Sequence, residues 1–467
     1  MMSRSFRSAV LALTALMAGC TVVGAPVPIP PAPMPPSAEA GGGRPADVEA
    51  PAERPAPIPV AEAPTPGLHT GLQPVRTFAE VRGLWVVRST MTSEAEVLAM
   101  VEKAASAGFN TLIVQVRGRA DAFYRSSLEP GAETISGPDG FDPLALAVTE
   151  GHRRGLAVHA WVNTHLVWGP APNPRSPDHL VNARPDWLGV PRALAEELFT
   201  LAPGDPRYVD ALRRYADRNR GTVEGIYTSP SHPEVKARVH EVWMELLDRY
   251  DLDGIHFDYI RFPSGDFDYS RGGLERFRAW VAAGNGGVGG VGPAGVPERF
   301  STAGEALAFV DAQPQAWADF RREQITGLVR RIYHDVKARR PEVVVSAAVI
   351  ADADDAFRHR FQDWPGWLAE GILDIAVPMA YTPDNARFDR QISEARSAAG
   401  VRERVWAGVG AYLNGLEGTL DKIDLARARG AGGVVLFSYD WAVGTAPGED
   451  DEPFLERVAR ERFRPVP

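Results

Sequence analysis

Eight short β-rich runs alternate with amphipathic helical stretches from residue 80 onward, and this pattern constrains the fold more than any other feature. Alternation of strands and helices predicts an α/β fold with a parallel sheet. Eight strands with intervening helices can close into a (β/α)8 TIM barrel with extended loops after the strands. An open, doubly wound sheet is the alternative, but no glycine-rich phosphate loop follows the first run. The predicted strands span residues 82–88, 110–117, 156–163, 253–262, 343–350, 373–381, 404–412 and 432–440.

Helix caps separate these runs. Helices are predicted over 93–107 and 143–154, because each begins after a capping residue and ends at a glycine. Ser231 and Glu234 have the spacing of a capping box, which predicts that a helix opens there. Further helices are predicted over 315–340, 364–370, 387–399, 419–429 and 452–462.

The N-terminal residues have the layout of an export signal. Positive charge in MMSRSFRS precedes an apolar run too short to span a bilayer, and Cys20 follows at once. LMAGC resembles a bacterial lipobox, so residues 1–19 are predicted to be a signal peptide and Cys20 the lipidated residue. An ordinary secretory signal cleaved nearby is the alternative. Thr21 favours sorting to the outer membrane, facing the periplasm. Cys20 is the only cysteine, which excludes disulfides within the chain.

Proline, alanine and glycine dominate residues 20–76, which cannot bury enough apolar surface to order themselves. This segment is predicted to be a disordered tether for a catalytic domain over 78–463. Within that domain, residues 164–230 carry several aromatics after the third strand and are predicted to form a wall of the cleft. The glycine-rich insertion near 283–302 is predicted to be a surface excursion.

Composition and missing motifs exclude several functions. A net charge of −10 argues against a nucleic-acid partner, which would favour a basic face. The chain has no HExxH motif and no GxSxG elbow, so neither a catalytic metal nor a serine nucleophile is predicted. No cofactor is predicted.

The segment DLDGIHFDYIRFP, the fourth predicted strand, brings charge to one end of an apolar run. Alternate side chains of a barrel strand point inward, which places Asp258 and His256 inside and Ile255 and Phe257 against the helices. A buried carboxylate is costly unless it is paired, and Arg261 could be its partner in a purely structural role. The functional alternative makes Asp258 catalytic, with His256 and Arg261 tuning its charge and orientation.

Other predicted strand ends combine aromatic rings with hydrogen-bonding groups. This mixture suits sugars, whose ring faces stack on aromatics while their hydroxyls require donors and acceptors. The candidate substrate-binding residues are Arg117, Trp161, Asn163, His165, His256, Arg261, Tyr381, Tyr412 and Trp441.

Glycoside hydrolysis requires two carboxyl groups. Asp258 is predicted to be one, and its partner stays open between Asp352, which follows the fifth strand, and Asp440, which ends the eighth. Glu129 lies in the second loop and is a further candidate. Asp352 could equally be a helix N-cap.

Five segments, in chain order, resemble a known family: RGLWVVR, GFNTLIVQVRGRADAFYRSSLEP, FDPLALAVTEGHRRGLAVHAWVN, SPSHPEVKARV and DGIHFDYIRFP. The family is the glycosyl-hydrolase-like family 10, and the resemblance spans residues 78–445. It implies a (β/α)8 glycosidase-like domain, often on a bacterial lipoprotein, and relatives include an envelope glycosidase that cleaves peptidoglycan strands stripped of stem peptides. By this resemblance Asp258 matches the acidic position of strand four, and Arg117, Asn163 and Tyr381 match polar cleft positions. The chain departs from the family after Arg117, where a proline is more usual than Gly118.

These features together predict a glycoside hydrolase, lipid-anchored in the bacterial cell envelope, that cleaves a glycan such as peptidoglycan with two carboxylates. Its partners would be the glycan strand, the membrane through Cys20, and cell-division or other envelope proteins. The alternative is an inactive glycan-binding lipoprotein. A second carboxyl group at hydrolytic distance from Asp258 would discriminate between the two.

Overall fold

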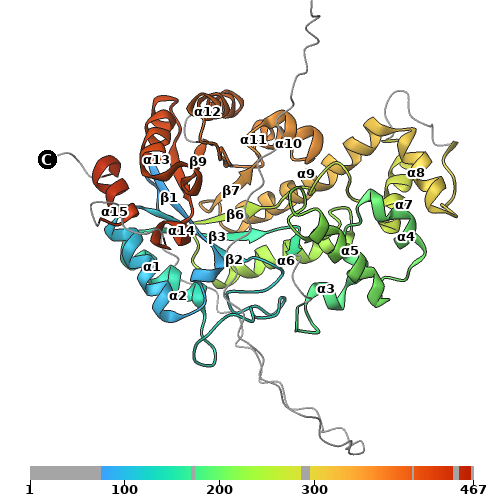
Figure 1. The fold of residues 1–467 in the computed structure, drawn as a ribbon, viewed down its shortest axis with the longest axis horizontal. Helices are drawn as coiled ribbons and strands as arrows, with labels where there is room; N and C mark the ends of the chain where they lie inside the picture. Colours follow the sequence, from blue (N-terminus) through green and yellow to red (C-terminus); the bar gives the residue numbers. More distant parts are fainter. Residues whose placement is uncertain (1–74, 170–173, 286–294, 402–403, 445–451, 464–467) are drawn as a thin grey trace, which may run out of the picture. The chain divides into compact units, whose positions relative to one another are not determined.

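A computed structural model describes residues 75–169, 174–285, 295–401, 404–444 and 452–463 (Figure 1). The predicted signal peptide, Cys20 and nearly all of the tether lie outside these residues, as does 286–294 within the glycine-rich insertion. Their structural assignments therefore stay predictions. Within the described ranges, no helix combines the length and apolar character that a bilayer crossing requires.

Eight parallel strands form one sheet, in the order β8-β7-β6-β3-β2-β1-β10-β9. Bridges from Ala376 to Val405 and from Met379 to Gly408 join β8 to β9, so the sheet closes nearly completely into a barrel. All eight predicted strands and the (β/α)8 fold are confirmed. The strands are β1 (Val81–Val86), β2 (Thr111–Arg117), β3 (Ala157–Asn163), β6 (Gly254–Asp258), β7 (Val344–Val349), β8 (Ile375–Pro378), β9 (Trp406–Gly410) and β10 (Gly433–Phe437).

Helices surround the strands (Figure 1). The Ser93 side chain accepts a hydrogen bond from the Glu96 amide at the start of α1, and Asp142 caps α2 in the same way, as predicted. These and the other long helices are α1 (Glu94–Ser106), α2 (Pro143–Arg153), α6 (Pro233–Arg249), α9 (Pro314–Arg339), α10 (Ala353–His359), α11 (Trp364–Glu370), α12 (Asn385–Ala399) and α13 (Ala411–Ala428). Two shorter helices, α14 (Tyr439–Gly444) and α15 (Phe454–Val458), follow β10.

Two helix starts differ from the sequence prediction. The predicted capping box at Ser231 is wrong, because the N-cap of α6 is His232 and the Ser231 hydroxyl bonds that of Ser229 at 3.0 Å. Glu234 instead accepts from Arg184 at 2.7 Å. Helix α13 begins at residue 411 and not 419, because the non-helical Gly415 (φ 58°) interrupts its first turns and obscures the pattern.

The long segment after β3 forms strands and helices of its own, outside the barrel sheet. It contains the antiparallel pair β4 (Leu166–Trp168) and β5 (Ile226–Tyr227) and the helices α3 (Leu180–Ala183), α4 (Ala195–Thr200) and α5 (Pro206–Arg218). Helix α4 packs beside the barrel with α7 (Arg271–Trp280) and α8 (Ala303–Asp311), around an apolar cluster that includes Phe199, Phe277 and Val310 (Figure 1).

The fourth barrel strand, β6, alternates as predicted. Ile255 and Phe257 are fully buried in the outer core, where Phe257 meets Trp243 of α6 with ring centroids 5.2 Å apart. His256 faces the barrel interior, where it accepts a hydrogen bond from Trp85 Nε1 at 3.0 Å. Burying one large apolar side chain stabilises the fold by about 2 kcal/mol, so the outward half of β6 anchors the strand. The inward half carries polar groups to the mouth of the barrel.

Candidate active site

Asp258 is the last residue of β6 and lies at the centre of the site. Its Oδ2 accepts a hydrogen bond from Trp161 Nε1 at 3.1 Å, and its Oδ1 accepts one from the Tyr259 amide at 2.7 Å. Burial raises the pKa of Asp258 to about 6, against the opposing charge of Arg261. Only 7% of the residue is exposed. The carboxyl therefore holds a proton up to mildly acidic pH, where an ordinary aspartate would be ionised.

The residue after Asp258 turns the chain sharply. Tyr259 has a φ of 48°, in the left-handed region that a non-glycine residue adopts at a cost of about 1–3 kcal/mol. The turn aims the Tyr259 amide at the Asp258 carboxyl, and the Thr164 amide donates to the Asp258 carbonyl at 2.8 Å. Strain at this position fixes the direction of the carboxyl group. No sequence signal marks Tyr259, because such turns are normally made by glycine.

Arg261 does not bind Asp258 directly but pairs with Glu224. Arg261 Nη2 lies 2.8 Å from Glu224 Oε1, and its guanidinium is 4.7 Å from the centroid of the Tyr259 ring. The other oxygen, Glu224 Oε2, accepts from the Tyr227 hydroxyl at 2.6 Å. Burial alone would raise the pKa of Glu224, but the charge of Arg261 and these hydrogen bonds outweigh it and lower the pKa. Glu224 therefore stays ionised.

Asp258 and Glu224 thus have opposite pKa shifts within one cluster. The negative charge of Glu224 also contributes to the raised pKa of Asp258, so the two carboxyl groups lie within electrostatic range. The Glu224 side chain is 23% exposed and remains open to solvent. Sequence reasoning missed Glu224, because it lies in the long segment after β3, outside any barrel strand. Its one local signal is its place two residues before β5.

Aromatic rings gather around this pair. Tyr381 stacks on Phe437 with centroids 5.6 Å apart and meets the edge of Tyr412 at 6.1 Å. Burial, Tyr412 and then Asp258 raise the pKa of Tyr381. Trp161 packs against Phe437 at 6.5 Å. The structure therefore brings the predicted residues Trp161, Tyr381 and Tyr412 together with Asp258, as a surface suited to sugar rings.

Asn163 links this surface to its neighbours. Its Oδ1 accepts from Trp161 Nε1 at 2.9 Å and from Gln115 Nε2 at 3.2 Å, while its Nδ2 donates to the Gly118 carbonyl at 2.9 Å. The predicted residue Asn163 thus supports the site from beneath. His256 does the same deeper in the barrel, where burial lowers its pKa well below the usual value and keeps it neutral.

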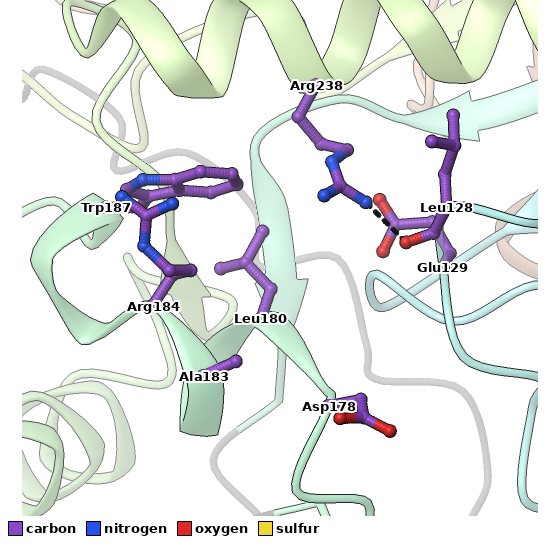
Figure 2. Close-up of a pocket in the computed structure, with 8 residues that line it drawn as sticks. All are labelled: Leu128, Glu129, Asp178, Leu180, Ala183, Arg184, Trp187 and Arg238. Carbon is purple, nitrogen blue, oxygen red and sulfur yellow. Dashed lines mark hydrogen bonds between the residues drawn. The ribbon is translucent and has the colours of Figure 1, made fainter. Parts of the chain in front are cut away.

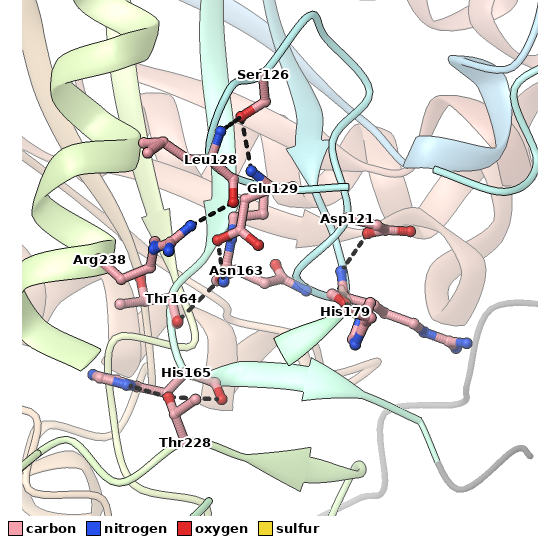
Figure 3. Close-up of polar contacts among 12 residues, drawn as sticks. Asp121, Ser126, Leu128, Glu129, Asn163, Thr164, His165, His179, Thr228 and Arg238 are labelled. Atoms are coloured by element: carbon pink, nitrogen blue, oxygen red, sulfur yellow. Dashed lines mark hydrogen bonds and ion pairs between the residues drawn. The ribbon is translucent and has the colours of Figure 1, made fainter. Parts of the chain in front are cut away.

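Two further predicted residues, Arg117 and His165, are enclosed in polar networks, and Figure 3 shows His165 together with Thr228. Arg117 is 1% exposed, pairs with Glu129 Oε1 at 3.2 Å, and donates to the Asn163 carbonyl at 2.6 Å. His165 is fully buried, and its Nδ1 lies 3.0 Å from Thr228 Oγ1. Arg117 therefore joins the loop after β2 to the end of β3, and His165 joins the start of the segment after β3 to its end.

The remaining predicted residues, Asp352, Asp440 and Trp441, make their contacts with other parts of the chain than Asp258. Asp352 is exposed and accepts from the Asp355 amide at 3.0 Å, as the N-cap of α10. Asp440 accepts from the Val87 amide at 2.9 Å and ties α14 to the segment after β1. Trp441 packs against Phe454 of α15, with centroids 5.1 Å apart.

A separate pocket of about 340 Å³ lies between the loops after β2 and β3 and helix α6. Figure 2 places Trp187 and Arg184 on one side and Arg238 and Glu129 on the other. Arg238 is held by the Leu128 carbonyl, and Arg184 lies 4.2 Å from the Trp187 ring. Neither Asp258 nor Glu224 lines this pocket. In the described ranges, no group of three or more His, Cys, Asp or Glu residues is placed to hold a metal ion.

A family model described as glycosyl hydrolase-like 10 matches residues 80–413. Glycosyl hydrolase DigH of Escherichia coli O6:H1 (strain CFT073) is 25% identical over 330 residues, which cover 66% of this chain and 63% of that protein. Glycosyl hydrolase YngK of Bacillus subtilis (strain 168) is 23% identical over 338 residues, covering 65% and 54%. The chain thus spans less than two thirds of the length of these relatives.

Solved glycoside hydrolase structures share the barrel. The glycoside hydrolase domain of PgaB (BpsB) from Bordetella bronchiseptica aligns with a TM-score of 0.55 and 14% identity, over 81% of this chain and 98% of that one. The catalytic domain of a β-amylase from Paenibacillus polymyxa aligns with a TM-score of 0.52 and 10% identity, over 82% and 98%. At these identities the likeness shows the fold alone.

Proposed function

Since the chain belongs to the glycosyl hydrolase-like 10 family, we propose that it hydrolyses glycosidic bonds with Asp258 and Glu224 as its two carboxyl groups. The observation that carries the proposal is the opposite pKa shift of two carboxyls in one cluster. A glycosidase requires one protonated and one ionised carboxyl, and environments that separate two pKa values in this way assign the roles.

In this mechanism Asp258 is the general acid. It donates its proton to the glycosidic oxygen as the bond to the leaving sugar breaks. Glu224, kept ionised by Arg261 and Tyr227, is the carboxylate that assists attack on the anomeric carbon. Water supplies the hydroxyl group of the new reducing end, and the remaining proton of that water goes to one of the two carboxylates. Trp161 and the Tyr259 amide hold the Asp258 carboxyl in a fixed direction, so that the proton is delivered without reorientation.

The proposed substrate is a glycan of the bacterial envelope, and peptidoglycan strands are the first to test. Tyr381 and Tyr412 offer ring faces for stacking beside the two carboxyls. The export signal and Cys20 would hold the enzyme at the envelope, where such glycans lie. Anchoring at Cys20 is part of the same proposal.

Incubation with purified, peptide-free glycan strands tests the function. The wild-type protein should release shorter oligosaccharides with new reducing ends, which mass spectrometry detects. Asp258→Asn should release none while still binding the strands. Binding without products from the wild-type protein would contradict hydrolysis and identify a glycan-binding protein.

A further inference from the structure

Two arginines that sequence reasoning passed over lie on the same rim of the barrel as Asp258, after two neighbouring strands. Arg88 follows β1 and Arg119 follows β2, and both are half-buried. In contrast to Arg117 and Arg261, neither forms an ion pair with a carboxylate among the described residues. Partly buried guanidinium groups without a paired carboxylate are unfavourable, because desolvation is not fully offset, and Asp121 acts on Arg119 through its charge without forming an ion pair. Such a pair is placed to receive an anion.

Arg88 is connected to Asp258 through hydrogen bonds. Its Nη1 donates to Gln115 Oε1 at 3.1 Å, and Gln115 Nε2 donates to Asn163 Oδ1 at 3.2 Å. Asn163 Oδ1 also accepts from Trp161 Nε1, which reaches Asp258 Oδ2 at 3.1 Å. Three barrel strands, β2, β3 and β6, contribute the residues between Arg88 and the acid, so the barrel itself fixes the path that connects them.

Gly118 provides the space that Arg88 occupies. A Cβ atom at position 118 would lie 2.5 Å from Arg88 Cδ and 3.1 Å from its Nε, so any other residue would displace the side chain. The absence of a side chain at Gly118 therefore permits the Arg88 guanidinium to lie over the backbone after β2.

Arg119 is held in place at its backbone. Its amide donates to Asp121 Oδ1 at 2.8 Å, and its carbonyl accepts from His179 Nε2 at 2.6 Å; Asp121 and His179 are drawn in Figure 3. Its guanidinium lies 5.7 Å from the Trp168 ring centroid and against Gly169. Asp121 thus bonds the backbone of Arg119 and acts on its guanidinium only through its charge, without a close ion pair.

The two arginines are near one another and near Tyr259. Burial and then the charge of Arg88 lower the pKa of Arg119 to about 10, while the charge of Asp121 and then Tyr259 act on it in the opposite direction. The Arg119 guanidinium remains protonated at neutral pH. The two arginines therefore add positive charge to the rim of the barrel on which Asp258 also lies.

We propose that Arg88 and Arg119 form an anion subsite that binds the carboxylate of an acidic sugar next to the scissile bond. This inference rests on the proposed function and adds a substrate class to it. Guanidinium groups bind carboxylates through paired, charge-assisted hydrogen bonds, which give direction as well as affinity. Two kinds of sugar carry such a group: one with an ether-linked lactyl carboxylate, as in muramic acid, and a uronic acid.

The test compares peptide-free glycan strands with the same strands after their carboxyl groups have been reduced to alcohols. Wild-type kcat/KM should be about tenfold or more higher on the carboxylate strands. In the Arg88→Gln/Arg119→Gln double variant the preference should disappear through a raised KM, while the exposed Arg153→Gln control keeps it. Equal rates of the wild type on both strands, or a preference that survives in the double variant, would overturn the subsite.

Binding measurements separate this inference from the proposed function. Calorimetry with the Asp258→Asn protein requires no turnover and should show tighter binding of the carboxylate strands. If a uronate oligosaccharide binds more tightly than its reduced form and the lactyl strands do not, the subsite is supported and the carboxylate is that of a uronic acid. If the wild-type protein cleaves nothing, the proposed function fails. If Asp258→Asn binds neither carboxylate better than its reduced form, the subsite fails. Arg119→Lys keeps the charge but not the planar guanidinium, so this variant should lose part of the preference for carboxylate strands. It replaces the double variant in the test if the double variant does not fold.

Discussion

Two buried arginines flank β3 at the mouth of the barrel, and each pairs with a glutamate, but the two pairs differ in what surrounds them. Arg117 is closed in with Glu129, whose side chain is 3% exposed, and its other donors reach backbone carbonyls. Arg261 holds Glu224, whose side chain is 23% exposed and lies in the electrostatic range of Asp258. Identical residue types thus form a structural brace in one place and part of a proposed catalytic pair in the other. Solvent access and a second carboxyl make the difference.

The largest effect is expected at Asp258. Asp258→Asn removes the proton donor and should lower kcat on glycan strands by about 10³-fold, within the usual range for a general acid. Reducing-end assays measure this directly. Asp352→Asn is a matched control, because asparagine caps a helix as well as aspartate does, and its activity and stability should stay near those of the wild type. A large loss of activity in Asp352→Asn, with little loss in Asp258→Asn, would show that Asp352 and not Asp258 is the catalytic carboxyl.

Glu224→Gln should lower kcat by about 10²-fold, since the amide keeps an acceptor for Arg261 or Tyr227 but carries no charge. The residual activity should also show an Asp258 pKa below that of the wild type, because a negative neighbour has been lost and Arg261 is no longer neutralised. Undiminished turnover in this variant would show that Glu224 is not catalytic and that another carboxyl group acts together with Asp258.

Loss of the Arg117–Glu129 pair should lower the stability of the fold and should not act on the catalytic step itself. Glu129→Ala leaves the Arg117 charge buried without a carboxylate, so it should lower the free energy of unfolding by about 3 kcal/mol in denaturant titrations. Asp354→Ala breaks an ion pair of which both side chains are more than 60% exposed, with Arg358, and should change stability by less than about 0.5 kcal/mol. Similar losses in both variants would show that the Glu129 pair is no more than a surface contact.

The same comparison explains which parts could be predicted from the sequence. Alternation within DGIHFD places Asp258 inward, because strand geometry alone decides this, and the eight strands follow from the same rule. Strand geometry cannot say whether a loop will cover the residue at the end of a strand. Arg117 ends β2 as a cleft residue should, but residues from the loops after β2 and β3 enclose it.

Glu224, Arg88 and Arg119 escaped prediction for a related reason. Glu224 and Arg119 lie in segments without periodic pattern, and Arg88 is the last residue of the first predicted strand. The positions of all three side chains depend on contacts between distant parts of the chain, such as Glu224 with Arg261. Gly118 could have signalled a close approach of another side chain, since a glycine after a strand often marks one. The identity of the approaching residue, Arg88, requires the fold.

The pH dependence of kcat/KM on glycan strands tests the central claim most directly, because it reports the ionisation of the free enzyme. Asp258 must be protonated to act and has a pKa of about 6, so kcat/KM should fall tenfold per pH unit above that value. The acid limb should lie below the ordinary range for glutamate, because the pKa of Glu224 is lowered. A profile that stays flat from pH 5 to pH 8 would contradict the account, since no carboxyl with a raised pKa would then donate the proton.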